Sequence, residues 1–141
     1  MASTLLLKPA LYRREGTPQA PNHPALLGGQ CVCGYVFFPM QHYGCERCGR
    51  TDLSPRPLSG QGTLVAAVRV HAHFGKHREA PFSVASVLLD DGPMVRSLIL
   101  TEEKMPESGT RIVTALVPVK NAEGVEHLDL RFIPAKDGDA Q

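Results

Sequence analysis

Four cysteines lie in two closely spaced pairs, Cys31-x-Cys33 and Cys45-x-x-Cys48, and each pair is followed directly by a glycine. Structural zinc takes four soft ligands at the corners of a tetrahedron, and two turns that each present two thiolates supply them without a large core. A glycine after each pair lets backbone amides turn toward the sulfurs without a clash from a Cβ atom. The spacing therefore predicts one structural Zn²⁺ site with four thiolate ligands: Cys31, Cys33, Cys45 and Cys48.

Three other interpretations of these cysteines remain to be weighed. The first pair is shorter than the usual Cys-x-x-Cys, so His42 stays open as a substitute ligand. Four thiolates also bind iron, as in rubredoxin-like centres. A redox role for Cys45 and Cys48 would need a thioredoxin-like strand and helix around them, and the sequence offers neither. If all four cysteines hold a metal, no position stays open for substrate and no thiol is left as a nucleophile, so no catalytic residue is predicted.

A second group of metal-binding residue types, His71, His73 and His77, carries a weaker signal. Alternate residues of a strand place two imidazoles on one face, but no cysteine or carboxylate completes a site. We interpret these histidines as the rim of a solvated loop. The sequence also lacks a nucleophile-elbow motif, a phosphate-binding loop and a dinucleotide fingerprint.

Composition limits the classes of function. The chain has 141 residues, of which 43% are hydrophobic and 21% charged, and its formal net charge is +1. These values are typical of a folded globular chain, and the charge gives no field that would attract nucleic acid or an anionic membrane. The apolar run at residues 5–7 is too short for a signal peptide or a membrane span, so we expect a cytoplasmic protein with reduced thiols.

The elements that must position the cysteines are predicted to be mainly β. Beyond Gly60 the hydrophobic pattern has a period of two, without a helical stripe. The expected strands are residues 63–70, 82–89, 94–100, 111–119 and 127–134, and the acidic residues at 90–91 belong to a solvated hairpin turn. Five short strands joined in this way predict an OB-type barrel, in which closure hides the sheet edges. The fold class is thus a rubredoxin-like zinc ribbon followed by a five-stranded OB-fold barrel.

The expected boundaries are an irregular N-terminal segment at 1–24, a zinc ribbon at 25–54, the barrel at 60–135 and a frayed tail at 136–141. Residues 51–59 contain two prolines and are interpreted as a stiff linker. The N-terminal segment is apolar between Leu5 and Tyr12, which indicates packing either on its own barrel or on another subunit. A ribbon face with Tyr35 and Phe37 is a second candidate for docking.

The sequence resembles the thiolase-associated zinc-ribbon/OB-fold proteins, known as the domain-of-unknown-function family numbered thirty-five. On the ribbon the resemblance rests on Cys31-x-Cys33 with the following Gly-Tyr-Val-Phe-Phe-Pro, and on Cys45-x-x-Cys48-Gly. On the barrel it rests on Gly-x-Gly-Thr at 60–63, Leu-Leu-Asp-Asp-Gly at 88–92 and Leu-Arg-Phe-Ile-Pro at 130–134. The short first pair of cysteines departs from the usual pattern of the family.

This resemblance implies a non-catalytic accessory subunit that binds a thiolase-like catalytic chain in a hetero-oligomer. The complex would act on coenzyme A thioesters, and the chain would assist its assembly. An accessory subunit of an acyl-CoA dehydratase or aldolase complex is the alternative within this class. A nucleic-acid-binding module is less favoured because the charge is nearly balanced, and a stand-alone enzyme is least favoured because no nucleophile and base are visible.

The densest basic run of the chain lies in the loop at 71–81, where an OB-type barrel joins its first two strands. Lys76, His77 and Arg78 suit the phosphates of coenzyme A, and Phe74 and Phe82 are suited to flank its adenine. Contact with acidic residues of the partner subunit is the competing interpretation. The sequence does not distinguish between these two roles.

Overall fold

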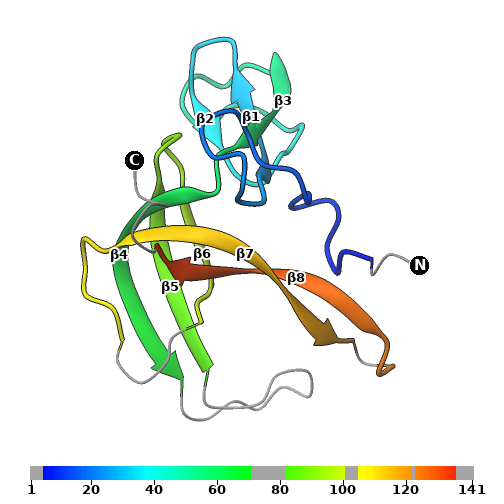
Figure 1. Ribbon diagram of the computed structural model, residues 1–141. Helices are drawn as coiled ribbons and strands as arrows, with labels where there is room; N and C mark the ends of the chain where they lie inside the picture. The colour runs from blue at the N-terminus through cyan, green and yellow to red at the C-terminus, as the bar shows by residue number, and fades with distance from the viewer. Residues whose placement is uncertain (1–4, 71–81, 101–104, 122, 136–141) are drawn as a thin grey trace.

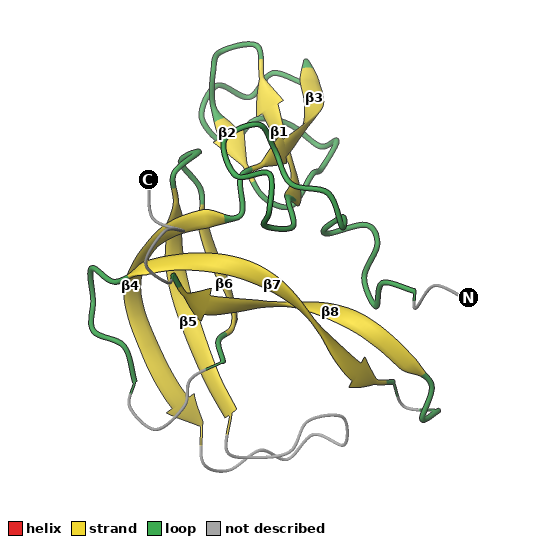
Figure 2. Cartoon of the chain, viewed as in Figure 1, coloured by secondary structure: helices red, strands yellow, loops and turns green. Residues whose placement is uncertain are grey.

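Figure 1 shows the computed structural model, which describes residues 5–70, 82–100, 105–121 and 123–135. These residues form eight strands in two sheets, and within them there is no helix (Figure 2). In that part of the chain, accordingly, no helix has the length and apolarity needed to cross a membrane. The smaller sheet carries the cysteines and sits at one end of the larger, strongly curled sheet.

The smaller sheet has the strand order β2-β1-β3 and is antiparallel throughout. Its strands are β1 (Leu26–Cys31), β2 (Val36–Phe37) and β3 (Leu53–Leu58). The prediction of a stiff linker at residues 51–59 is therefore wrong for most of that range, because β3 is a strand that pairs with β1 along its whole length. Pro55 and Pro57 are two residues apart, so both ring nitrogens lie on one side of β3. An edge strand can leave that side without a partner.

The larger sheet confirms the predicted five-stranded barrel of the OB type. Its strands are β4 (Gln61–Val70), β5 (Phe82–Leu89), β6 (Met94–Leu98), β7 (Arg111–Lys120) and β8 (Glu126–Pro134), in the order β6-β5-β4-β7-β8. The two outer strands meet through a parallel bridge between Ile99 and Phe132, where the Leu100 N–H donates to the Phe132 carbonyl at 2.9 Å. The sheet thereby curls until its two edge strands, β6 and β8, meet at this bridge.

The barrel and the ribbon share one hydrophobic core. Leu26 and Leu58 of the ribbon sheet are 2% and 0% exposed and belong to the same cluster as the interior of the barrel. Barrel residues of this cluster include Leu64, Val87, Leu89, Ile112 and Phe132. Burial of these side chains couples the stability of the two sheets, because neither can separate without exposing apolar surface.

Polar contacts at the junction add to this coupling. The Asp91 carboxylate accepts hydrogen bonds from the Ser59 backbone N–H at 3.0 Å and hydroxyl at 2.6 Å, and from Arg56 of β3 at 3.1 Å. The Thr114 hydroxyl of β7 donates to the Pro24 carbonyl at 2.7 Å. Solvation alone was expected to account for Asp91, but its side chain is only 11% exposed. It instead holds the ribbon against the barrel.

The described part of the N-terminal segment packs on its own chain, as the first of the two alternatives predicted. The Leu7 N–H donates to the Leu128 carbonyl at 2.8 Å, and the Leu27 N–H donates to the Leu11 carbonyl at 2.8 Å. Tyr12 is 3% exposed, whereas Leu5 is 68% exposed. The described part of this segment therefore forms a third layer that bridges β8 and β1.

Candidate metal centre

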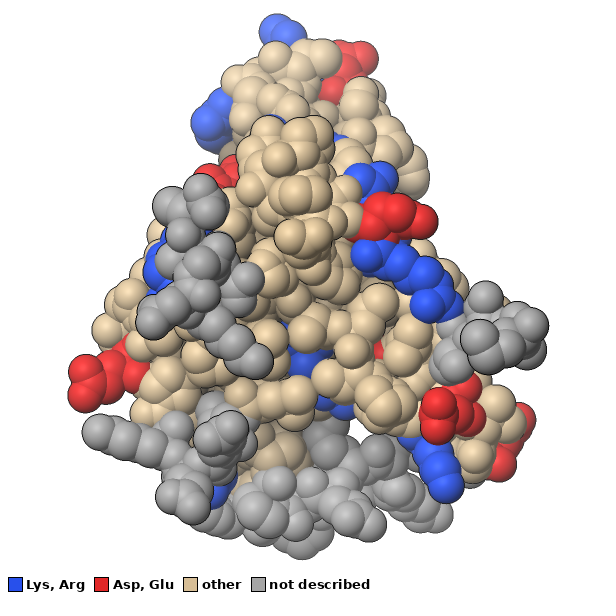
Figure 3. Space-filling model, viewed as in Figure 1, with Lys and Arg blue, Asp and Glu red and all other residues tan. Residues whose placement is uncertain are grey.

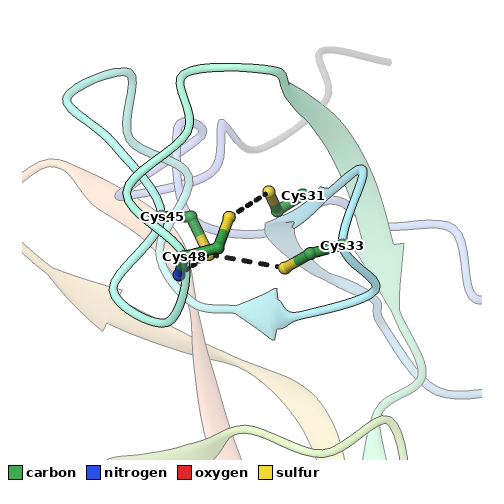
Figure 4. A group of neighbouring side chains, drawn as sticks. All are labelled: Cys31, Cys33, Cys45 and Cys48. Carbon is green, nitrogen blue, oxygen red and sulfur yellow. Dashed lines mark hydrogen bonds between the residues drawn. The ribbon is translucent and has the colours of Figure 1, made fainter.

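Two turns of the ribbon bring the four cysteines together (Figure 4). Cys31 ends β1 and Cys33 lies in the turn to β2, while Cys45 and Cys48 lie in the connection from β2 to β3. Each turn is closed by a backbone hydrogen bond, from the Gly34 N–H to the Cys31 carbonyl at 2.9 Å and from the Gly49 N–H to the Cys45 carbonyl at 2.8 Å. Both glycines have positive φ, 98° and 80°, which other residues rarely adopt.

The distances between the sulfurs fit a tetrahedral metal centre. Sγ of Cys31 lies 3.5 Å from Sγ of Cys48, and Sγ of Cys33 lies 3.7 Å from Sγ of Cys45. All four sulfur atoms lie within 4.8 Å of one another. A tetrahedron with metal–sulfur bonds of about 2.3 Å has sulfurs about 3.8 Å apart. The four cysteines can therefore hold one metal ion, and the set of donors fits zinc and iron alike.

Hydrogen bonds from the turns favour thiolates at this site. The backbone N–H groups of Arg47 and Cys48 donate to Sγ of Cys45 at 3.3 and 3.4 Å. A backbone hydrogen bond from Tyr35, against the opposing effect of burial, helps to lower the pKa of Cys33 to about 6, and the Arg47 guanidinium contributes to the same shift. Thiolate is the form that binds metal, so these donors prepare Cys33 and Cys45 for a cation, whereas the pKa of Cys31 is raised in the absence of one.

Arg47 contacts the sulfur cluster, and the sequence analysis did not identify it. Its guanidinium donates to the Cys33 carbonyl at 2.6 Å and to Sγ of Cys33 at 3.4 Å, and it lies 5.7 Å from the centre of the Tyr35 ring. Four thiolates around a divalent ion carry two excess negative charges, and an adjacent cation offsets part of that charge. A basic residue between Cys45 and Cys48 was the signal in the sequence that could have identified it.

The other predicted site residues do not join this cluster. His42 is among the described residues but is not part of the sulfur cluster, so the four-cysteine set is the one that the geometry favours. The three histidines of the basic loop, together with Phe74, Lys76 and Arg78, lie outside the described residues. Phe82 is described and begins β5 in a half-buried position. The structure therefore brings together the predicted metal ligands and leaves the predicted loop site untested.

The predicted docking face on the ribbon is only half available. Phe37 is 4% exposed and stacks with Tyr35 at a centroid distance of 6.2 Å. Because Phe37 is buried within its own chain, it is not available to a partner, so the expectation is wrong for Phe37. Tyr35 is half-buried, and its predicted role in docking stays a prediction. Tyr43, in the same ribbon, is 93% exposed.

A second polar cluster, also missed from sequence, joins the N-terminal segment to β8. The Tyr12 hydroxyl donates to Asp129 Oδ1 at 2.7 Å, and Arg131 donates to Asp129 Oδ2. Burial alone would raise the pKa of Asp129, but the hydrogen bonds from Arg131 and Tyr12 lower it below its usual value. Burial and the contact with Asp129 raise the pKa of Tyr12 to about 12. This cluster fastens the segment to the barrel.

Comparison with known proteins supports the fold. The sequence matches no family model and no curated protein. The structure is similar to a solved structure described as "Ltp2-ChsH2(DUF35) aldolase", with a TM-score of 0.61 and 22% sequence identity. The match covers 79% of this chain and 86% of that chain. At this identity the likeness establishes a shared fold.

Proposed function

We propose that this chain is a non-catalytic, zinc-containing accessory subunit of an enzyme complex that acts on coenzyme A thioesters. The observation that carries the proposal is the likeness of its fold, over most of both chains, to a DUF35 protein in an aldolase structure. The sequence resemblance to that family rests on residues of the ribbon and the barrel that make up this fold. They include the four cysteines and residues 130–134 of β8.

The geometry of the sulfur cluster favours a helper role over catalysis. All four cysteines of the chain lie in the cluster, so a bound metal leaves no thiol for acyl transfer. A metal with four thiolate ligands also has no open position for water or substrate, unlike a catalytic zinc. In this proposal zinc stabilises the ribbon, and the chemistry belongs to the partner subunit.

Two kinds of catalytic partner fit the proposal. A thiolase-like chain is the partner that the sequence resemblance implies. An aldolase is the second candidate, and the description of the similar solved structure favours it. Both kinds of enzyme act on carbon–carbon bonds, but they catalyse different reactions. The reaction catalysed by the purified complex therefore distinguishes a thiolase-like partner from an aldolase.

A nucleic-acid-binding role is not favoured by the surface. The net charge is +1, and on the face shown in Figure 3 basic and acidic side chains are interspersed rather than gathered into a basic stripe. Binding to a phosphate backbone depends on several lysines or arginines that act together. The affinity purification described next also tests for bound nucleic acid.

The proposal is tested by affinity purification of the tagged chain from its own cells, followed by identification of the bound chains and assays with coenzyme A thioesters. We expect a stable complex with a thiolase-like or aldolase chain, turnover by the complex, and none by this chain alone. Turnover by the isolated chain would overturn the accessory role. Recovery of nucleic acid in place of a catalytic chain would favour the module alternative.

A second experiment tests the basic loop at 71–81 within that complex. If Lys76 and Arg78 hold the phosphates of the coenzyme, the double variant Lys76→Ala/Arg78→Ala is expected to raise KM for the thioester about tenfold. Association of the subunits should be unchanged. Unaltered kinetics in an intact complex would remove the loop from substrate binding, and loss of association would assign it to the interface.

A further inference from the structure

A cavity of about 290 Å³ lies where the N-terminal segment passes over the gap between β6 and β8. These two strands are not neighbours in the hydrogen-bonded sheet, and among the described residues a single bridge, Ile99 to Phe132, links them. The residues that directly precede the bridge on each strand, 95–98 of β6 and 129–131 of β8, line the cavity. The incomplete closure of the barrel thus leaves a space that the N-terminal segment borders rather than fills.

The lining of this cavity is amphipathic. Much of its wall is apolar, with Leu11 from the N-terminal segment, Phe38 from the ribbon, and Val95, Leu98 and Leu130 from the barrel. Three cations also border it, which are Lys8, Arg96 and Arg131, against one carboxylate, Asp129. The apolar wall and the excess of positive charge favour an occupant that has both an apolar body and a negative head.

The charges are not equally available to such an occupant. Asp129 is already bound by Arg131, by Tyr12 and by the Leu130 N–H at 3.0 Å, so its charge is compensated within the protein. Among the described residues, Arg96 donates one hydrogen bond, from Nε to the Ser86 hydroxyl at 3.3 Å. Within the described ranges neither Arg96 nor Lys8 forms an ion pair. Two exposed cations therefore border the cavity, and the charge of Lys8 also acts on Asp129, whose pKa it helps to lower.

We propose that this cavity binds a small amphipathic carboxylate, with its chain against the apolar wall and its head between Lys8 and Arg96. The volume is about twice the ~150 Å³ of a cavity that accommodates benzene, so roughly a dozen heavy atoms fit. None of the four cysteines of the sulfur cluster lines this cavity. It does not depend on the accessory-subunit proposal.

The test is a titration of the metal-loaded full chain with octanoate, followed through backbone amide shifts in ¹⁵N–¹H spectra. Octan-1-ol, which has the same chain but no charge, is the matched ligand. We expect the largest shifts at Leu11, Leu98 and Leu130, and an affinity for octanoate about tenfold above that for octan-1-ol. Two exposed ion pairs each contribute a factor of up to about five, which together account for that ratio.

The double variant Lys8→Ala/Arg96→Ala is expected to lose about tenfold in octanoate affinity and to bind octan-1-ol as before. Both side chains are exposed, so the fold should be preserved, and Lys120→Ala, a charge change at the end of β7, is the matched control. Equal affinity for the two ligands, unchanged octanoate binding in the double variant, or shifts confined to another surface would each overturn the proposal.

Discussion

The variant Cys45→Ser is expected to lose its metal and to unfold the ribbon. Cys45 is 4% exposed, and its sulfur accepts two backbone hydrogen bonds that a smaller hydroxyl cannot reproduce at the same distances. Structural zinc contributes an apparent ~10–16 kcal/mol in small finger peptides, which is as large as the whole stability of a typical domain. Because Leu26 and Leu58 join the barrel core, the loss should also lower the unfolding temperature of the barrel.

Elemental analysis and thermal unfolding measure this outcome, with one zinc ion per chain expected in the native protein. His42→Ala is the matched control, and it should retain the metal because His42 is not part of the cluster. Thiolates must be deprotonated to bind, so acidification should release the metal, and the release should lower stability. A native protein without zinc, or a coloured protein that contains iron, would contradict the choice of metal. Cys45→Ser with a full complement of metal would contradict the ligand set.

Much of this architecture could be predicted because its signals are local. Alternation of apolar and polar residues specifies a strand wherever one face is buried, and all five predicted runs are strands whose ends agree within two residues. The predicted metal ligands were equally evident in the sequence, because the two turns that carry the pairs of cysteines also bring their sulfurs together. In both cases the residues that interact lie close together in the sequence or follow its period.

The features that were missed depend on contacts that no local pattern encodes. The prolines of β3 indicated a linker. They are compatible with a strand because β3 lies at the edge of its sheet and pairs with β1 on one side only. Asp129 alternates with apolar neighbours along β8, a pattern that is typical of the solvent-facing side of a strand. It is 8% exposed because Tyr12, 117 residues away, covers it. Burial on the outer face of a barrel is decided by whatever segment crosses it, and the sequence does not state which segment that is.

This covered carboxylate supports the second large prediction, in which Asp129→Ala lowers the free energy of unfolding by about 3 kcal/mol at pH 7. Removing one partner of a buried pair leaves the other charge uncompensated, which costs about 3–5 kcal/mol. Here the side chains of Arg131 and Asp129 are 14% and 11% exposed, so we expect the lower end of that range. Chemical denaturation of the metal-loaded protein measures the difference.

An exposed ion pair of the same types provides the matched control. Asp90 and Arg111 are 38% and 31% exposed, and Asp90→Ala should cost less than about 1 kcal/mol, although Arg111 donates two hydrogen bonds to that carboxylate. Equal losses in the two variants would show that the covering by Tyr12 has no energetic consequence.

The pH dependence separates charge pairing at Asp129 from simple packing. The folded protein holds the pKa of Asp129 below its usual value, so the stabilisation is fully present above the unfolded pKa of about 3.9 and disappears as the pH falls through the folded pKa. The gap in stability between the native protein and Asp129→Asn should therefore be constant from about pH 5 to 8 and shrink below about pH 4. A gap that does not change with pH would instead assign the loss to packing, because an amide has nearly the shape of the carboxylate but cannot carry its charge.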